Sequence, residues 1–284
     1  MSDLDLIKEL REKTGAGFLD CKNTLKENNN NIEESIDSLR KKGLAKASKK
    51  SSREAKEGAV GFFSNDKISI ILKINSETDF SAKSDTFLDF LDLIGKIALK
   101  QNDKSLNLEN FLNIKYNDKS VSDLLKEMIA KIGENLIIND LKIFSNKELN
   151  VNFYIHNPYR KNIGKIVSAV FFYSDTKNEE ITTFSKNICM HIAASKPEAM
   201  DIDQLSSTVI ENEKKIQQEM IQDSGKPSNV MEKILKGKMK KYYSEVTLLN
   251  QNFVIDPDKT IKEAINDFNS LNKFDLKSYA LISL

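Results

Sequence analysis

An acidic and an aromatic residue stand side by side at Asp79 and Phe80, where the apolar stretch 67–74 gives way to polar residues. A carboxylate next to an aromatic ring suits contact with another protein, because the ring supplies an apolar anchor and the carboxylate accepts hydrogen bonds. An ordinary turn at the start of a helix explains the pair equally well, with Asp79 as the N-cap and Phe80 tucked into the core. On residue types alone, both roles stay open.

Groups that could form a reactive centre are scarce. The two cysteines, Cys21 and Cys189, and the two histidines, His156 and His191, are far apart in the sequence, which argues against a structural zinc site. None of the Gly-Lys pairs has both the upstream glycine and the following Ser or Thr of a phosphate-binding loop, and no serine stands in a nucleophile elbow. We therefore expect no catalytic residue, no metal ligand and no cofactor, and hence no enzyme.

The surroundings of the same residues suggest structural roles for most of them. His191 falls on an apolar helical pattern, so we interpret it as a packed or partly exposed structural histidine. Cys21 is interpreted as a small buried side chain on a helix. His156 follows a predicted strand and precedes Asn157 and Pro158, and a contact role and a turn role are equally good interpretations of it.

The composition is that of a globular protein with more than one structural unit. The chain has 284 residues, of which 39% are hydrophobic and 30% charged. Its 43 basic and 42 acidic residues almost cancel, so the net charge gives no general attraction to nucleic acid or to an anionic membrane. The first residues lack the layout of a signal peptide, and no apolar run approaches the ~18 residues of a membrane span. We expect a cytoplasmic protein with reduced cysteines.

The N-terminal part is expected to be helical and then basic. Apolar residues at helical spacing predict three short helices within residues 3–45. The following basic segment, 41–56, is rich in small residues, and we interpret it as a solvated, partly helical linker. The functional alternative for this segment is contact with RNA or the ribosome.

The remainder mixes strands and helices. Two strands and a helix are predicted twice, at 59–63, 67–74 and 87–98, and again at 151–154, 165–173 and 181–193. This repeat favours an internal duplication, and a further strand is predicted at 136–144. Residues 204–239 carry a thin apolar seam that predicts a protruding antiparallel helical hairpin, broken at 224–227. Strand-like sequence at 245–249 and 253–255 indicates that the hairpin is inserted within the second core unit.

Several segments carry a resemblance to a known family: 10–22, 39–47, 75–83, 132–135, 191–197, 224–227 and 251–254. In this order and spacing they closely resemble bacterial elongation factor Ts, the family of guanine-nucleotide exchange factors for elongation factor Tu. The resemblance implies an α+β fold with small antiparallel sheets. Its expected parts are a three-helix ubiquitin-associated-like domain at 1–50, a basic linker at 51–57, one core subdomain at 58–145, a related one at 146–196 and 240–284, and a coiled-coil hairpin at 197–239.

The resemblance also implies a function. The protein is expected to bind elongation factor Tu in its GDP form and to promote GDP release by displacing magnesium and disturbing the phosphate-binding loop. The residues implied in magnesium displacement are Thr78, Asp79, Phe80 and Ser81. Those implied in further contacts are Thr14, Gly15, Gly17, Lys22, Ile132, Gly133 and His156. A homodimer through the partner or the hairpin is the further expected assembly, with no direct nucleic-acid or membrane partner; the alternative function is RNA or ribosome binding through 41–56.

Two departures from the family pattern bear on these residues. Ser81 stands where the family usually has an apolar residue, so the tip of the segment is expected to be less hydrophobic than average. The interval from His156 to Gly164 is longer than is customary, which affects the placement of His156.

Overall fold

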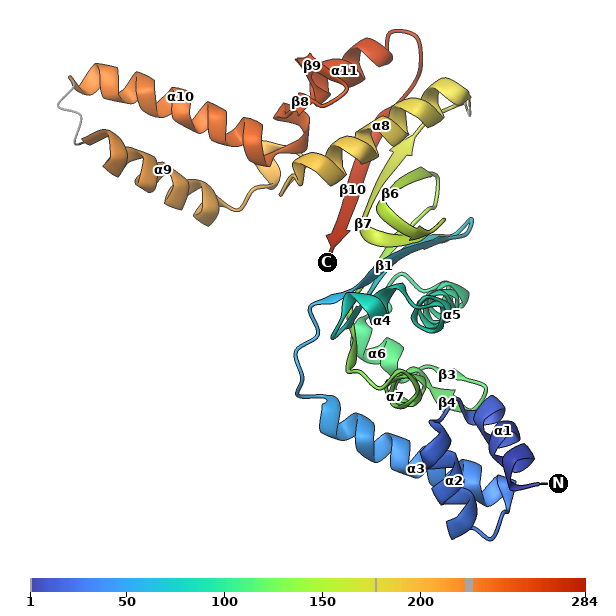
Figure 1. Ribbon diagram of the computed structural model, residues 1–284. Coiled ribbons are helices and arrows are strands. Elements are labelled where there is room, and N and C mark those ends of the chain that lie inside the picture. The colour runs from blue at the N-terminus through green and yellow to red at the C-terminus, as the bar shows by residue number, and fades with distance from the viewer. Residues whose placement is uncertain (1, 177, 223–226) are drawn as a thin grey trace. The chain divides into compact units, whose positions relative to one another are not determined.

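The computed structural model describes residues 2–176, 178–222 and 227–284 and confirms the predicted α+β class (Figure 1). The chain forms two compact units. The first comprises Met1–Ser145, Asn157–Ile166 and Ile282–Leu284, and the second comprises Asn146–His156 and Val167–Leu281. The finer domain boundaries expected from the sequence stay a prediction. Among the described residues, no helix has the length and apolar character to cross a membrane.

Three helices open the first unit: α1 (Asp3–Thr14), α2 (Phe18–Glu27) and α3 (Ile32–Lys50). Their small shared core contains Cys21, which is fully buried as predicted. The third helix runs five residues past its predicted end, so residues 41–50 form the helical part of the basic segment, which was interpreted as partly helical. The reason is twofold: Lys and Ala favour helix, and α3 packs against α7 (Val121–Ile132).

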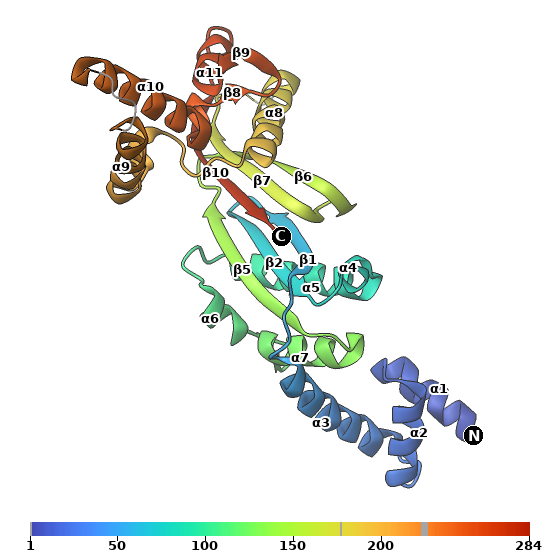
Figure 2. The same ribbon diagram turned by 60° about the vertical axis from the view of Figure 1, so that its left-hand side comes forward.

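An antiparallel sheet follows in the order β1 (Glu57–Ser64), β2 (Ile68–Ser76) and β5 (Leu136–Ser145). Nearly every residue of β2 is buried, which fits its continuous apolar sequence. The predicted apolar face of α5 (Asp85–Gln101) is buried against β1 and β2 (Figure 2). Smaller elements complete this unit: α4 (Asp79–Lys83), α6 (Leu108–Leu112), β3 (Lys115–Tyr116) and β4 (Lys119–Ser120).

The predicted repeat of two strands and a helix returns as β6 (Asn150–Arg160), β7 (Ile163–Tyr173) and α8 (Glu179–Ser195). In the second unit β7 lies between β6 and β10 (Asp275–Ser283). Aromatic rings fill its core, with the Phe184 and Phe268 rings stacked at 4.1 Å between centroids. The remaining elements are η1 (Ile202–Gln204), η2 (Leu248–Asn250), β8 (Asn252–Phe253), β9 (Asp256–Thr260) and α11 (Ile261–Phe268).

The predicted helical hairpin is present in the second unit as α9 (Ser207–Gln222) and α10 (Ser228–Val246), which pack on each other. The predicted break at 224–227 lies mostly outside the described residues, which resume at Pro227.

Three predictions for the second half of the chain are wrong in detail. The strand expected at 245–249 does not form, because α10 continues to Val246 and a buried Leu248 then begins η2. The strand expected at 253–255 is short, because Phe253 ends β8 and Asp256 already begins β9. The turn expected at Asn157 is also absent, since β6 continues to Arg160; asparagine tolerates the φ of +49° that it adopts there.

Gly58 in β1 occupies a position that only glycine fits. Its φ is +146°, and an added Cβ would lie 2.2 Å from the carbonyl oxygen of Ile74 on the paired strand. Gly237 in α10 is a matched contrast, because a Cβ there would meet no described atom within 4 Å.

We therefore predict that Gly58→Ala lowers the free energy of unfolding by about 1–3 kcal/mol, because backbone must move to admit the methyl group. Gly237→Ala should raise it by roughly 0.5–1 kcal/mol, because alanine loses less entropy in a helix. Thermal unfolding followed by circular dichroism measures both. Equal effects of the two substitutions would contradict the assignment of Gly58.

His191 is fully buried on α8, which is the packed one of the two structural placements that its helical pattern predicted. Its Nδ1 accepts a hydrogen bond from the Val254 amide at 3.3 Å, so Nε2 carries the proton and donates to Gln251 Oε1 at 2.9 Å. Burial lowers the pKa of His191, because the charged imidazolium would lose its hydration.

A pH dependence of stability follows. Below about pH 6.5 His191 is protonated in the unfolded chain but stays neutral in the folded chain. The free energy of unfolding should therefore fall as the pH is lowered from 7.5 to 6. The slope due to one such group is at most about 1.4 kcal/mol per pH unit. Urea midpoints across this range test it, and they should slope less in His191→Asn. An identical slope in that variant would rule out His191 as the source.

Candidate functional site

The candidate contact segment begins where β2 ends beside the start of β5. The last residue pair of these antiparallel strands is Ser76 with Leu136. Residues that follow β2 therefore lie next to residues that precede β5, although they are far apart in the sequence. At this end of the two strands Thr78 contacts Glu134, and Glu77 contacts Asn135.

The segment forms the short helix α4, and its N-cap is Thr78. The Thr78 hydroxyl accepts a hydrogen bond from the Ser81 amide at 3.2 Å. Asp79 is thus the first helical residue rather than the cap, and the Phe80 side chain is 85% exposed rather than tucked into the core. The structural role considered for this pair is wrong on both counts, and the aromatic ring is free to meet another molecule.

Asp79 is paired within its own helix. Its carboxylate lies 2.9 Å from the Lys83 ammonium, four residues along α4. The hydrogen bond from Lys83 holds the pKa of Asp79 below its usual value. The carboxylate next to the exposed ring of Phe80 is therefore already paired with an ammonium group of the same helix.

Ser81 points the other way. Its side chain is only 7% exposed, and its Oγ has no hydrogen-bond partner among the described residues. The family pattern suggested that Ser81 makes the exposed tip of the segment less hydrophobic. It does not, because its side chain lies on the buried side of α4. Ala82 is buried beside it, and together they attach α4 to the first unit.

Glu134 grips the start of α4. Its two carboxylate oxygens accept hydrogen bonds from Thr78, one from the amide at 3.1 Å and one from the hydroxyl at 2.8 Å. Sequence reasoning did not single out Glu134 as a site residue. The only signal for it was its place within the family segment 132–135, because its partner Thr78 is 56 residues away.

The implied contact residues Ile132 and Gly133 stand directly before this grip. Ile132 is partly buried against the core of the first unit. Gly133 ends α7 with a φ of +88°, and its carbonyl accepts a hydrogen bond from the Lys50 ammonium at the end of α3. The structure thus brings these two residues to the base of α4.

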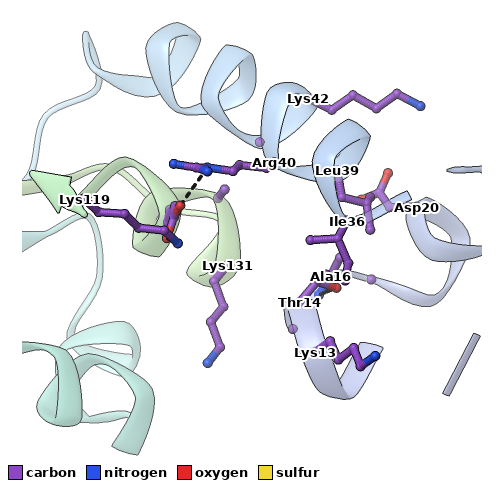
Figure 3. Close-up of a pocket in the computed structure, with 15 residues that line it drawn as sticks. Lys13, Thr14, Ala16, Asp20, Ile36, Leu39, Arg40, Lys42, Lys119 and Lys131 are labelled. Atoms are coloured by element: carbon purple, nitrogen blue, oxygen red, sulfur yellow. Dashed lines mark hydrogen bonds and ion pairs between the residues drawn. The ribbon is translucent and has the colours of Figure 1, made fainter. Parts of the chain in front are cut away.

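The implied contacts in the three-helix region line a separate hollow of about 230 Å³, also within the first unit. Figure 3 shows Thr14 on one side of it and Lys131 on α7 on the other. Gly15 and Gly17 line it as well. Its cationic lining residues are Lys13, Arg40, Lys42, Lys119 and Lys131.

Charges at this hollow are partly paired. The dashed line in Figure 3 marks the ion pair between Arg40 Nε and Glu127 at 3.0 Å, and Lys119 reaches the same carboxylate at 2.7 Å. Lys22 does not line the hollow and is exposed on α2.

His156 belongs to the second unit and is exposed on β6. Its Nδ1 lies 3.3 Å from the Tyr154 hydroxyl. Among the described residues, no group of three or more His, Cys, Asp or Glu side chains is arranged to hold a metal ion.

Known proteins resemble this chain over most of its length. The family model described as elongation factor TS matches residues 77–283. A protein named Elongation factor Ts from Allorhizobium ampelinum is 40% identical over 262 residues, which cover 92% of this chain and 85% of that protein. Proteins of the same name from Rhizobium etli and Rhizobium meliloti are 41% and 39% identical, with the same coverage. The chain therefore belongs to the elongation factor Ts family of translation elongation factors.

Proposed function

We propose that this protein is a guanine-nucleotide exchange factor that binds elongation factor Tu in its GDP form and promotes GDP release during translation elongation. Membership of the family supports the choice of partner. The observation that carries the proposal is Phe80, an aromatic side chain 85% exposed on a short helix whose N-cap, Thr78, is held by two hydrogen bonds. An anchor held in this way enters a partner without first having to be ordered.

The proposed mechanism acts on the partner's magnesium. Mg²⁺ is a hard cation that bridges phosphate oxygens, so displacement of its ligands weakens the grip of a GTPase on GDP. Phe80 enters the nucleotide-binding domain as an apolar wedge and disturbs the phosphate-binding loop. Asp79, whose carboxylate lies 2.9 Å from the Lys83 ammonium, stands beside the wedge and would offer the partner's cation a competing oxygen ligand.

Magnitudes show that the wedge needs help. A thousandfold acceleration of release requires about 4 kcal/mol of differential stabilisation. Burial of one phenylalanine side chain contributes roughly 1.5–3 kcal/mol. Further contacts must supply the rest, and we assign them to the residues that the family resemblance implies: Thr14, Gly15, Gly17, Lys22, Ile132, Gly133 and His156.

No second function is proposed for the basic segment 41–56, because several of its cations already have partners. Lys42 pairs with Glu27, Lys50 with the Gly133 carbonyl, and Lys56 with Glu54. Arg53 Nη1 lies 3.5 Å from Glu77. Cations engaged within the chain leave less charge for the phosphates of an RNA.

Phe80→Ala should slow catalysed GDP release about 10- to 100-fold, because it removes a central interface anchor. Stopped-flow release of labelled GDP from elongation factor Tu measures this. Leu271→Ala is the matched control, since Leu271 is 89% exposed in the second unit and belongs to no proposed contact; it should leave the rate unchanged. Full activity of Phe80→Ala would exclude the wedge, and no acceleration by the unaltered protein would exclude the function.

GDP and this protein should weaken each other's binding to elongation factor Tu, because thermodynamic coupling between two ligands is reciprocal. We expect GDP to weaken the complex with elongation factor Tu by the same factor by which the protein weakens GDP binding. Calorimetric titration of the nucleotide-free and the GDP-loaded GTPase measures this factor. Equal affinity for the two forms would show that the protein binds without promoting exchange.

A further inference from the structure

We propose that Glu134 is a positioning residue for exchange: it holds α4 so that Phe80 projects, and the turn that carries it ties this placement to the end of α3. The inference rests on the proposed function and deepens it. Glu134 does not itself touch the nucleotide or the magnesium in this account. It acts through Thr78 on the side chain two residues further on.

Helix α4 has little stability of its own. It has only five residues, and an isolated helix of that length is unstable in water. In a capping box, the third helical residue reaches back to the amide of the N-cap. That residue of α4 is Ser81, which is turned inward, and Glu134 supplies the missing acceptor from 56 residues away. The direction of Phe80 therefore depends on this carboxylate at the start of α4, together with the burial of Ser81 and Ala82 along one side.

Asn135, the residue after Glu134, binds both the segment that precedes Thr78 and the segment that follows α3. The Asn135 amide donates to Glu77 Oε1 at 2.6 Å, just before Thr78. The Asn135 side-chain amide donates to the Arg53 carbonyl at 2.7 Å, and Arg53 Nη1 lies 3.5 Å from Glu77 Oε2. One turn thus holds both the chain that leaves α3 and the chain that enters α4.

The turn at 133–135 also connects the two contact regions of the first unit. Lys50, the last residue of α3, also donates to the Gly133 carbonyl in this turn. Contacts made by the three-helix region and by Phe80 are therefore fixed at a set spacing within the first unit. When the spacing is fixed, binding energy from the three-helix contacts can be used to press Phe80 into the partner. A small displacement of Phe80 would then lower the rate of GDP release.

The test is a double-mutant cycle with Glu134→Gln and Phe80→Ala. Glutamine keeps the size of the side chain, but its amide nitrogen cannot accept the second hydrogen bond. Glu134→Gln should lower the maximal rate of GDP release about tenfold, with the half-saturating concentration changed by less than about twofold. In the Phe80→Ala background it should have almost no further effect, because the group it positions is gone. Glu109→Gln, an exposed carboxylate on α6, is the control and should change nothing.

Hydrogen–deuterium exchange supplies a readout independent of activity. Glu134→Gln should speed amide exchange in residues 78–82 and leave α5 unchanged. An undiminished effect of Glu134→Gln in the Phe80→Ala background, or unaltered exchange in 78–82, overturns the proposal. If the unaltered protein fails to accelerate GDP release, the proposed function falls instead, and the hydrogen-exchange result still decides whether Glu134 holds α4.

Discussion

The candidate site depends on the register of β2 against β5. Their pairing brings the end of one strand to the start of the other at Ser76 and Leu136, and a bulge between Lys73 and Ile74 sets which residues arrive there. Ile70, Leu72 and Ile74 of β2 pack in the core of the first unit, and a slip of one residue would bring the polar residues Ser69, Lys73 and Asn75 to that face. Burial of the strand thus fixes the register, and the register places Glu134 opposite Thr78. Without Glu134 at this position, the amide of Thr78, the N-cap of α4, would lose the carboxylate that accepts its hydrogen bond.

Exposure of an aromatic ring does not by itself mark a functional site. Leu271 is as exposed as Phe80, and isolated exposed apolar residues are ordinary on protein surfaces. The difference lies in how Phe80 is held: Thr78 is bound by both oxygens of one carboxylate, and Ser81 is buried beneath. A short helix fastened at its start and along one side keeps its outward residue in place, which is the property that a wedge needs. In this account the chain supplies shape and position, and the chemistry of release belongs to the partner's magnesium and phosphates.

Local pattern was enough to predict much of the fold. The helical spacing of α5, the apolar run of β2, the burial of Cys21 and the structural placement of His191 on a helix follow from sequence pattern. The details that failed depend on contacts between distant residues. Thr78 and Asp79 are both good N-caps, and nothing local decides between them. The apolar residues at 245–249 suit a strand, yet they end a helix and enter the core of the second unit. Glu134 was missed because its partner is remote in the sequence, so only the resemblance to the family pointed toward its segment.

In the proposed mechanism Phe80 reaches the magnesium and phosphate region of elongation factor Tu. A photo-crosslinking phenylalanine analogue placed at position 80 tests this most directly, with the same analogue at position 271 as the reference. After irradiation with GDP-loaded elongation factor Tu, mass spectrometry of the joined peptides locates the contact. We expect cross-links from position 80 to the phosphate-binding loop and the adjoining magnesium-ligand segment, and none there from position 271. Cross-links from position 80 to another domain of the GTPase, or a yield no higher than that of the reference, would contradict it.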